Sequence, residues 1–427
     1  MITTLFIAAV VLMAIGMPIA FSLGMAAALS VFVGGKYPQA IVFKEMFTGI
    51  DSFPLMAVPF FILAAEIMSG GALTLVLLRF ASQFVGHLRG GLGHANILSL
   101  TLFSGISGSA LADAAGPGSM MVKMMDKAGY SRAYAAALTA STAIVGPIIP
   151  PSIIMIIYAL QDESVSVGGL FIAGFAPGIL IAVAMAIVNW RVCVKRDYRS
   201  REPRPTMREI LVNSFKAIPA LMLVVLILVG IRFGIFTPTE ASVVAVFYAL
   251  ICGKFVYRTL EWSALPSIIA RSAFLTASVL FVVAASGAFA WVLTINGLPQ
   301  QLANLIISWD LSPIAFLIAV NIFLLLFGIF MEPLPGVMIL VPILAPISAA
   351  LGIDPIHFAM VVIVNLTLGM ITPPVGGLLF VTSVATKVPL SALTRELPPF
   401  LVAHAIVLMM LTFIPAISTW LPHTLGF

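Results

Sequence analysis

Long apolar runs without a charged residue dominate the pattern along the chain. LMLVVLILVGI (Leu221–Ile231) and FLIAVNIFLLLFGIF (Phe316–Phe330) are two of them. A helix that crosses a bilayer needs about 20 mostly apolar residues, whereas the strands of a membrane barrel appear as short alternating segments. The pattern therefore predicts membrane-spanning helices. We expect six clear spans, at roughly residues 169–190, 215–233, 239–253, 267–293, 313–330 and 400–421.

The first 20 residues form another apolar run, and no Lys or Arg precedes Lys36. A secretory signal peptide would begin with a positively charged region. We therefore expect a first membrane helix here, and the lack of early positive charge favours an external N-terminus.

The apolar pattern repeats between the two halves of the chain. GPIIPPSIIMIIYA (146–159) aligns with GMITPPVGGLLFVT (369–382) at an offset of 223 positions, and the same offset places Gly105 on Gly328. Internal duplication is typical of transporters built from inverted repeats. We predict an all-α polytopic membrane protein with a first repeat over residues 1–190, a basic loop over 191–212 and a second repeat over 213–427.

Each repeat also contains a short polar turn between apolar arms. In the first half the arms at 95–103 and 116–125 are only nine or ten residues long. Such helices are too short to cross about 30 Å of hydrocarbon. We predict a re-entrant hairpin in each half, followed by a helix broken at the Gly and Pro-Pro positions; short helices packed at an interface are the alternative.

Composition agrees with a membrane protein. The chain of 427 residues is 61% hydrophobic and 9% charged, whereas soluble domains are about 45–50% apolar and 25% charged. Seven of the 21 Lys and Arg residues lie between Arg191 and Glu209, which predicts a cytoplasmic loop; a patch for acidic lipid or a partner is the alternative. Nucleic acid is not expected as a partner, because no soluble basic domain is predicted to hold it.

Broken backbone at membrane depth leaves carbonyl groups without helical partners. A dehydrated Na⁺ is a suitable partner for them, and two related sets of oxygen atoms follow from the repeat. One combines residues 105–113 with 145–151, and the other combines 328–332 with 369–374. The alternative is that these glycines and prolines only kink helices.

Four ionisable residues lie in apolar surroundings and are functional candidates: Glu66, Asp113, Glu240 and Glu332. Asp113 directly follows a Ser-rich break, so it could bind an ion, carry a proton, hold a substrate hydroxyl or cap the next helix. In FTPTEAS (236–242), Thr237 and Glu240 have the spacing of a capping box with Pro238 at the first helical position. We expect Glu240 to be a capping residue.

No catalytic constellation is visible. The chain has no G-x-S-x-G with a partnered His, no H-E-x-x-H and no G-x-x-x-x-G-K-[ST]. We therefore expect a transporter and not an enzyme, driven by an ion gradient or by another chain.

Four motifs together carry a family resemblance: GIFTPTEAS (234–242), GISGSALADAAGPGSMM (105–121), GPIIPPSIIMIIYA (146–159) and NLTLGMITPPVGGLLFV (365–381). Over essentially its full length the sequence resembles the large transmembrane subunit of tripartite ATP-independent periplasmic (TRAP) transporters. The resemblance implies a Na⁺-driven elevator-type importer in the lipid bilayer of a bacterial inner membrane. It also implies two partners, a separate small membrane subunit of four helices and a soluble periplasmic substrate-binding protein. The expected cargo is an organic acid such as a C4-dicarboxylate, sialic acid or another sugar acid.

The resemblance also assigns roles to residues at the hairpin tips and helix breaks. The residues implied for a first Na⁺ are Ser104, Ser107, Gly146, Ile149 and Pro151. Those implied for a second Na⁺ are Gly328, Glu332, Gly369, Thr372 and Pro373, with the backbone carbonyl of Glu332 expected to bind in place of its carboxylate. Substrate contact is implied for Ser107, Ser109, Asp113 and Thr372.

Other classes of membrane protein remain as alternatives. A stand-alone Na⁺/organic-anion symporter would share the repeats but would need no binding protein. A channel or an intramembrane enzyme would not need Na⁺. The polar residues cluster at two related breaks and do not line one path, which disfavours a channel. No nucleophile–base pair is visible in the sequence, which disfavours an enzyme.

Overall fold

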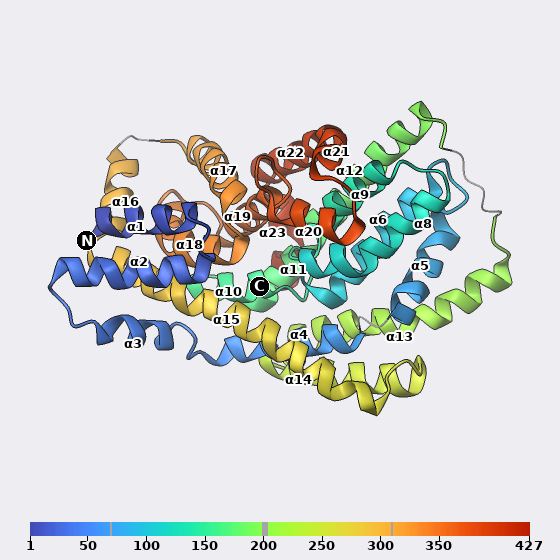
Figure 1. Cartoon of the computed structure of the whole chain (residues 1–427), viewed down its shortest axis with the longest axis horizontal. Coiled ribbons are helices and arrows are strands. Elements are labelled where there is room, and N and C mark those ends of the chain that lie inside the picture. Colours follow the sequence, from blue (N-terminus) through green and yellow to red (C-terminus); the bar gives the residue numbers. More distant parts are fainter. Residues whose placement is uncertain (69–70, 199–203, 309–310) are drawn as a thin grey trace.

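The computed structural model describes residues 1–68, 71–198, 204–308 and 311–427, and every regular element in these ranges is a helix (Figure 1). The helices of the first half are α1 (Ile2–Ala14), α2 (Ile19–Gly34), α3 (Ala40–Thr48), α4 (Ala57–Met68), α5 (Gly71–Val85), α6 (Gly91–Ser107), α7 (Ala110–Asp113), α8 (Ser119–Lys127), α9 (Arg132–Ala143), α10 (Ile153–Gln161), α11 (Val167–Ala173) and α12 (Phe175–Lys195). Those of the second half are α13 (Met207–Arg232), α14 (Pro238–Ile251), α15 (Leu265–Ile295), α16 (Leu298–Ser308), α17 (Pro313–Phe330), α18 (Pro333–Ala350), α19 (Pro355–Gly369), α20 (Gly377–Thr386), α21 (Leu390–Glu396), α22 (Pro398–Phe413) and α23 (Ala416–Thr424).

The described residues contain 6 helices long and apolar enough to cross a membrane, or up to 9 if each bent helix pair forms one span. The spans predicted near 169–190, 215–233, 239–253, 267–293 and 313–330 are confirmed as apolar helices, with ends that differ by a few residues. The span predicted at 400–421 is one of the bent helix pairs, and it is a single span only if the pair crosses the membrane together. It consists of α22 and α23, bent by 56°, because Pro415 lies between them and has no N–H with which to continue the first helix.

The hairpin arms are longer than predicted. The first arm, α6, has 17 residues, and the second runs from α7 through a π-helical segment (Ala114–Gly118) into α8. α6 begins at Gly91, and the buried Gly93 in its first turn lies against Asn189 of α12. A small residue at such a position allows close helix packing.

The structural repeat follows the offset found in the sequence. Ser107 and Phe330, the last residues of α6 and α17, are 223 positions apart, as are Lys127 and Ala350, the last residues of α8 and α18. The peptide bonds Pro150–Pro151 and Pro373–Pro374, also 223 positions apart, are both cis. Residues 199–203 of the predicted basic loop, including Arg199 and Arg201, lie outside the described residues, and the division of the chain at 191–212 stays a prediction.

α12 and α22 correspond in the two repeats and run in opposite directions. Arg196, which follows α12, pairs with Glu396, just before α22, at 2.6 Å. At the other end α11, which precedes α12, packs against α23, which follows α22. The end of α12 therefore lies beside the start of α22, as expected for inverted repeats.

The hairpins and broken helices interlock across the repeats. α10, after the first break, packs against α18 of the second hairpin, while α20, after the second break, packs against α7 and α8 of the first. A second group of helices, α2, α3, α4, α14 and α15, packs together, and α3, α4 and α14 lie in the lower part of Figure 1. This group touches the hairpins through α15 against α18 and α4 against α6. The name hairpin block is used below for α6 to α10 and α17 to α20 together with α12 and α22. The second group is called the outer group.

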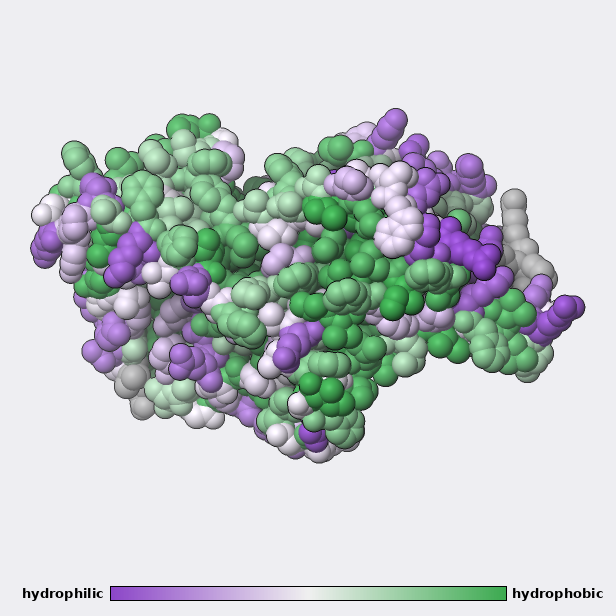
Figure 2. Space-filling view, turned by 90° about the horizontal axis from the view of Figure 1, so that it is seen from below, coloured by the Kyte–Doolittle hydropathy of each residue, from purple (hydrophilic) through white to green (hydrophobic). Residues whose placement is uncertain are grey.

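The outside of the molecule is largely apolar. Large apolar side chains such as Phe43, Phe215 and Phe274 are more than 70% exposed. Figure 2 shows a broad hydrophobic surface, with most hydrophilic residues gathered toward its edges. Such a surface is suited to lipid and not to water.

The capping box predicted at the start of α14 is confirmed. The N–H of Glu240 donates to Thr237 Oγ1 (3.2 Å), and the N–H of Thr237 donates to Glu240 Oε2 (2.8 Å). Glu240 therefore satisfies backbone donors at a helix start and lies outside the hairpin block.

Candidate functional site at the first hairpin and helix break

The tip of the first hairpin is the short turn between α6 and α7. Gly108 ends α6 with a φ of 61°, and its N–H donates to the Ser104 carbonyl at 3.1 Å. Ser109 then caps α7, because its Oγ accepts the N–H of Ala112 at 3.4 Å. The chain reverses within these few residues, since glycine adopts a positive φ at little cost.

Asp113 is fully buried one helical turn beyond this tip. Its carboxylate accepts hydrogen bonds from Ser104 Oγ at 3.1 Å and from Ser107 Oγ. Ser107 Oγ also accepts the N–H of Ser109 at 3.3 Å. The capping role considered for Asp113 is wrong, since its side chain makes no cap hydrogen bond and instead joins hydroxyl groups from the end of α6.

The break between α9 and α10 lies directly against this tip. A Cβ atom on Gly146 would be 2.9 Å from Asp113 Oδ2. A Cβ atom on Gly108 would collide with the carbonyl oxygen of Pro151, and one on Gly105 would lie 3.6 Å from that of Pro150. Within the described part of the chain, neither of these two proline carbonyls accepts a hydrogen bond.

The first predicted set of residues is thus largely brought together. Ser104, Ser107, Gly146 and Pro151 meet around the tip and Asp113. Ile149 belongs to the same break, but its side chain points to α12, where it would meet a Cβ atom on Gly178. Only the backbone of Ile149 is available to the residues around Asp113. The apolar pattern of the sequence does not show which way its side chain points.

The second hairpin and break form a related but different arrangement. A Cβ atom on Gly369 would be 2.6 Å from Gly328 Cα, and the N–H of Gly376 donates to the Ile329 carbonyl at 3.4 Å. Gly328 and Gly369 are therefore neighbours. The remaining members of the set lie on the more exposed side of this break, with Glu332 exposed and Thr372 and Pro373 half-buried.

The Glu332 carbonyl, expected as an ion ligand, accepts the N–H of Gly336 at 3.3 Å. Gly336 is the residue 223 positions after Asp113, and Phe330 is the residue 223 positions after Ser107. Ser107 and Asp113 therefore have no polar counterpart in the second site, whereas Ser109 corresponds to Glu332. The two sites share a backbone plan but not their side chains.

The four residues assigned to substrate do not form one hydrogen-bonded group. Ser107, Ser109 and Asp113 are connected at the first tip, whereas Thr372 Oγ1 donates to the Leu368 carbonyl at 2.9 Å in the other break. α20, which follows the second break, packs against α7 of the first hairpin.

Sequence reasoning missed a buried pair of amides near the second break. Asn365 lies on α19 and Asn321 on α17. Asn365 Nδ2 donates to Asn321 Oδ1 at 2.8 Å and to the Asn321 carbonyl at 2.9 Å. Both side chains are buried. Each Asn lies alone in an apolar run, and that isolation was the signal available in the sequence.

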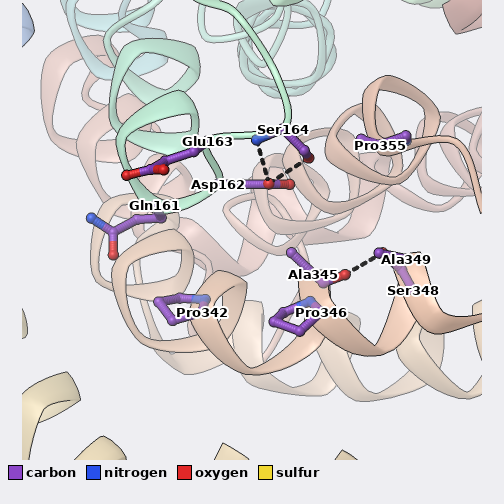
Figure 3. A pocket seen from close by; sticks show the side chains of 10 residues that line it. All are labelled: Gln161, Asp162, Glu163, Ser164, Pro342, Ala345, Pro346, Ser348, Ala349 and Pro355. Atoms are coloured by element: carbon purple, nitrogen blue, oxygen red, sulfur yellow. Dashed lines mark hydrogen bonds between the residues drawn. The ribbon is translucent and has the colours of Figure 1, made fainter.

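A separate pocket of about 280 Å³ lies between the end of α10 and α18 (Figure 3). On one side of the pocket, Asp162 accepts hydrogen bonds from the Ser164 N–H and hydroxyl, at 3.0 and 2.5 Å. On the other side, Pro342 and Pro346 of α18 line the pocket. None of the residues predicted to bind an ion or a substrate lines this pocket. It is therefore distinct from the candidate site.

Comparison with known proteins gives a consistent result. The family model described as "Tripartite ATP-independent periplasmic transporter, DctM component" matches residues 6–417. The chain is 41% identical over 405 residues to a C4-dicarboxylate TRAP transporter large permease protein, DctM, of Pseudomonas aeruginosa, covering 95% of this chain and 94% of that protein. It is 39% identical over 408 residues to a sialic acid TRAP transporter large permease protein, SiaM, of Vibrio cholerae, covering 96% and 95%.

Among solved structures, the YdaH transporter of Alcanivorax borkumensis has a similar fold. The TM-score is 0.63 and the match covers 90% of each chain, at 13% sequence identity. This likeness concerns the fold alone.

Proposed function

This chain belongs to the family of DctM components of tripartite ATP-independent periplasmic (TRAP) transporters, and from that premise we propose that it imports an organic acid by Na⁺-coupled symport. It is a large permease subunit, a multi-pass membrane transporter and not an enzyme. The observation that carries the proposal is the group formed by Asp113, the Ser104 and Ser107 hydroxyls and the unbonded proline carbonyls at the first break.

The electrostatics of this group favour a bound cation. A buried carboxylate repels an anionic substrate, and the repulsion is strong where water is excluded. The described tip and break supply only Asp113 as a charged side chain, along with oxygen atoms of hydroxyl and carbonyl groups. Hard cations prefer oxygen ligands. A Na⁺ bound here would neutralise the negative charge of Asp113 and so reduce its repulsion of the anionic substrate.

Two Na⁺ sites, one in each half, are the form of coupling that we propose. The first uses the oxygen atoms of Ser104, Ser107, Gly146, Ile149 and Pro151. The second uses the backbone around Gly328 and Gly369 with Glu332, Thr372 and Pro373. Coupling then requires that Na⁺ and substrate each raise the affinity for the other, by the same factor.

The substrate class follows from the chemistry of the tip and from the relatives. The matched proteins are transporters for C4-dicarboxylate and for sialic acid, both of which are organic acids with hydroxyl or carboxylate oxygens. The hydroxyl groups of Ser107 and Ser109 can donate to such oxygens. We propose that Asp113 and Thr372 complete the contact with the substrate.

The movement that we propose is an elevator. The hairpin block interlocks across the two repeats, and the outer group packs together and touches the block through α15 against α18 and α4 against α6. A block of this kind can slide against a fixed scaffold while it carries the substrate between the membrane faces. The outer group would be the scaffold.

The proposed partners are a small four-helix membrane subunit and a periplasmic substrate-binding protein, and the proposed location is a bacterial inner membrane. The deciding experiment is uptake of radiolabelled succinate and sialic acid into proteoliposomes that contain this chain. Each partner is omitted in turn. We expect uptake only with both partners present; uptake by this chain alone would instead support a stand-alone symporter.

A further inference from the structure

The helix before the first break ends with one carbonyl group released from the helical pattern. In a continuing α-helix the N–H of Val145 would bond to the Ser141 carbonyl, four residues earlier. It bonds instead to Thr142, at 3.0 Å, and the N–H of Gly146 likewise bonds to Ala143. This tightening leaves the Ser141 carbonyl without a backbone donor in a fully buried position. An unpaired buried carbonyl is costly.

The partner of this carbonyl comes from the other repeat. His404 Nε2, on α22, lies 3.0 Å from the Ser141 oxygen. A carbonyl oxygen can only accept, so Nε2 carries the hydrogen and donates it. His404 is 2% exposed. Its side chain thus caps the carboxyl end of α9 from a helix more than 250 positions away in the sequence.

We propose that His404 is a positioning residue for the first helix break. Ser141 precedes Gly146 by five residues, and Gly146 packs against Asp113 and the hairpin tip. Holding the Ser141 carbonyl fixes where α9 ends, and that end sets the course of the chain through Gly146 to the proline pair. His404 therefore shapes the first site without touching an ion or a substrate.

The second repeat solves the same problem differently. The N–H of Met370 bonds to Thr367 at 3.1 Å, which releases the carbonyl of Leu366. A Cβ atom on Gly328 would lie 3.4 Å from that carbonyl oxygen. Ile181, the residue 223 positions before His404, is buried and has no donor group. Only the first break, among the described residues, is capped by a histidine from the opposite repeat.

The cap is tested first by hydrogen–deuterium exchange of the whole purified chain in detergent. His404→Leu removes the donor, His404→Gln keeps an N–H group at a similar distance, and His357→Leu is the matched control. The control removes a second buried histidine, which lies at the start of α19 in the second repeat and bonds to Ser418 at 3.0 Å. We expect the amides of residues 142–146, 148 and 149 to exchange about tenfold faster in His404→Leu. In the other two variants they should exchange as in the wild type. Unchanged exchange in His404→Leu would overturn the proposal.

A functional readout separates positioning from general stability, and it rests on the Na⁺ coupling proposed above. In the reconstituted transporter we expect His404→Leu to raise the Na⁺ concentration for half-maximal uptake about tenfold, and His404→Gln to restore it. A lowered maximal rate with unchanged Na⁺ dependence would overturn the positioning role. If wild-type uptake does not depend on Na⁺ at all, the coupling fails, and the exchange experiment still decides whether His404 holds the break.

Discussion

Gly328 and Gly369 lie so close together that a Cβ atom on Gly369 would be 2.6 Å from Gly328 Cα. The first residue is near the end of α17 and the second is the last of α19. Their contact brings the second hairpin onto the second helix break with no side chain between them. The same close approach of backbone defines the first site, where Gly146 meets the tip beside Asp113.

Gly369→Ala should therefore disrupt the second site. The added methyl group must displace backbone atoms, and overpacking of this kind costs about 1–3 kcal/mol. We expect a lower unfolding temperature and loss of uptake. Gly377→Ala is the control, because a Cβ atom on Gly377 meets nothing within 4 Å. Equal unfolding temperatures for the two variants, measured in detergent by intrinsic fluorescence, would contradict the contact.

Gly108→Ala tests the fit between the first tip and the break. A side chain there faces both a positive φ and the Pro151 carbonyl oxygen. Gly129→Ala serves as the control, since Gly129 has a φ of 92° but open space around it. We expect Gly108→Ala to lose uptake and Gly129→Ala to lose only stability, by about 1 kcal/mol. Similar uptake by the two variants would show that the tip does not need this contact.

Asp113→Asn retains the shape of the side chain but removes its charge. If the carboxylate helps to hold Na⁺, the Na⁺ concentration for half-maximal uptake should rise at least about tenfold, equivalent to roughly 1.4 kcal/mol. Asp162→Asn, in the separate pocket near α18, should leave that concentration unchanged. Normal Na⁺ dependence in Asp113→Asn would remove Asp113 from the ion site.

Ser107→Ile places a bulky apolar group where a hydroxyl bonds to Asp113. We expect uptake to be abolished while the protein stays folded, since Ser107 lies at the half-buried tip and not in the packed core. Ser278→Ile, at an exposed position of α15, should transport normally. Gel filtration in detergent checks folding. Normal Na⁺-dependent uptake by Ser107→Ile would reject the first site.

Glu240→Ala tests whether the Glu240 carboxylate only caps α14 and takes no part in transport. Loss of the capping box should lower the unfolding temperature, because the N–H of Thr237 loses its acceptor. The Na⁺ dependence of uptake should not change, because Glu240 lies at the start of α14 in the outer group. A shift in Na⁺ dependence at normal stability would give Glu240 a role in transport.

Local patterns predicted much of this architecture. The aligned Pro-Pro motifs place both breaks 223 positions apart, and Thr237, Pro238 and Glu240 predict a helix start that the hydrogen bonds confirm. Both are short-range signals, in which the residues that interact are near one another in the chain. The bend at Pro415 had a similar local signal, but the surrounding apolar residues concealed it.

Contacts between distant segments were not predictable in the same way. The hairpin arm α6 starts at Gly91 and packs against Asn189 of α12 at Gly93, and the hydropathy pattern does not contain that contact. His404 looked like one of five scattered histidines, although it caps a helix of the other repeat. The sequence also placed both Na⁺ sites on one plan, whereas Gly336 and Phe330 occupy the positions of Asp113 and Ser107 in the second.

The central claim is that an inward Na⁺ gradient drives uptake through the site at the first break. The most direct test uses proteoliposomes that contain this chain with both proposed partners, loaded with K⁺ and placed in a Na⁺ buffer. Internal radiolabelled substrate is then measured against time. We predict accumulation above the external concentration, and its collapse when a Na⁺ ionophore removes the gradient. Accumulation that persists without a Na⁺ gradient, or uptake that only equilibrates, would contradict the account.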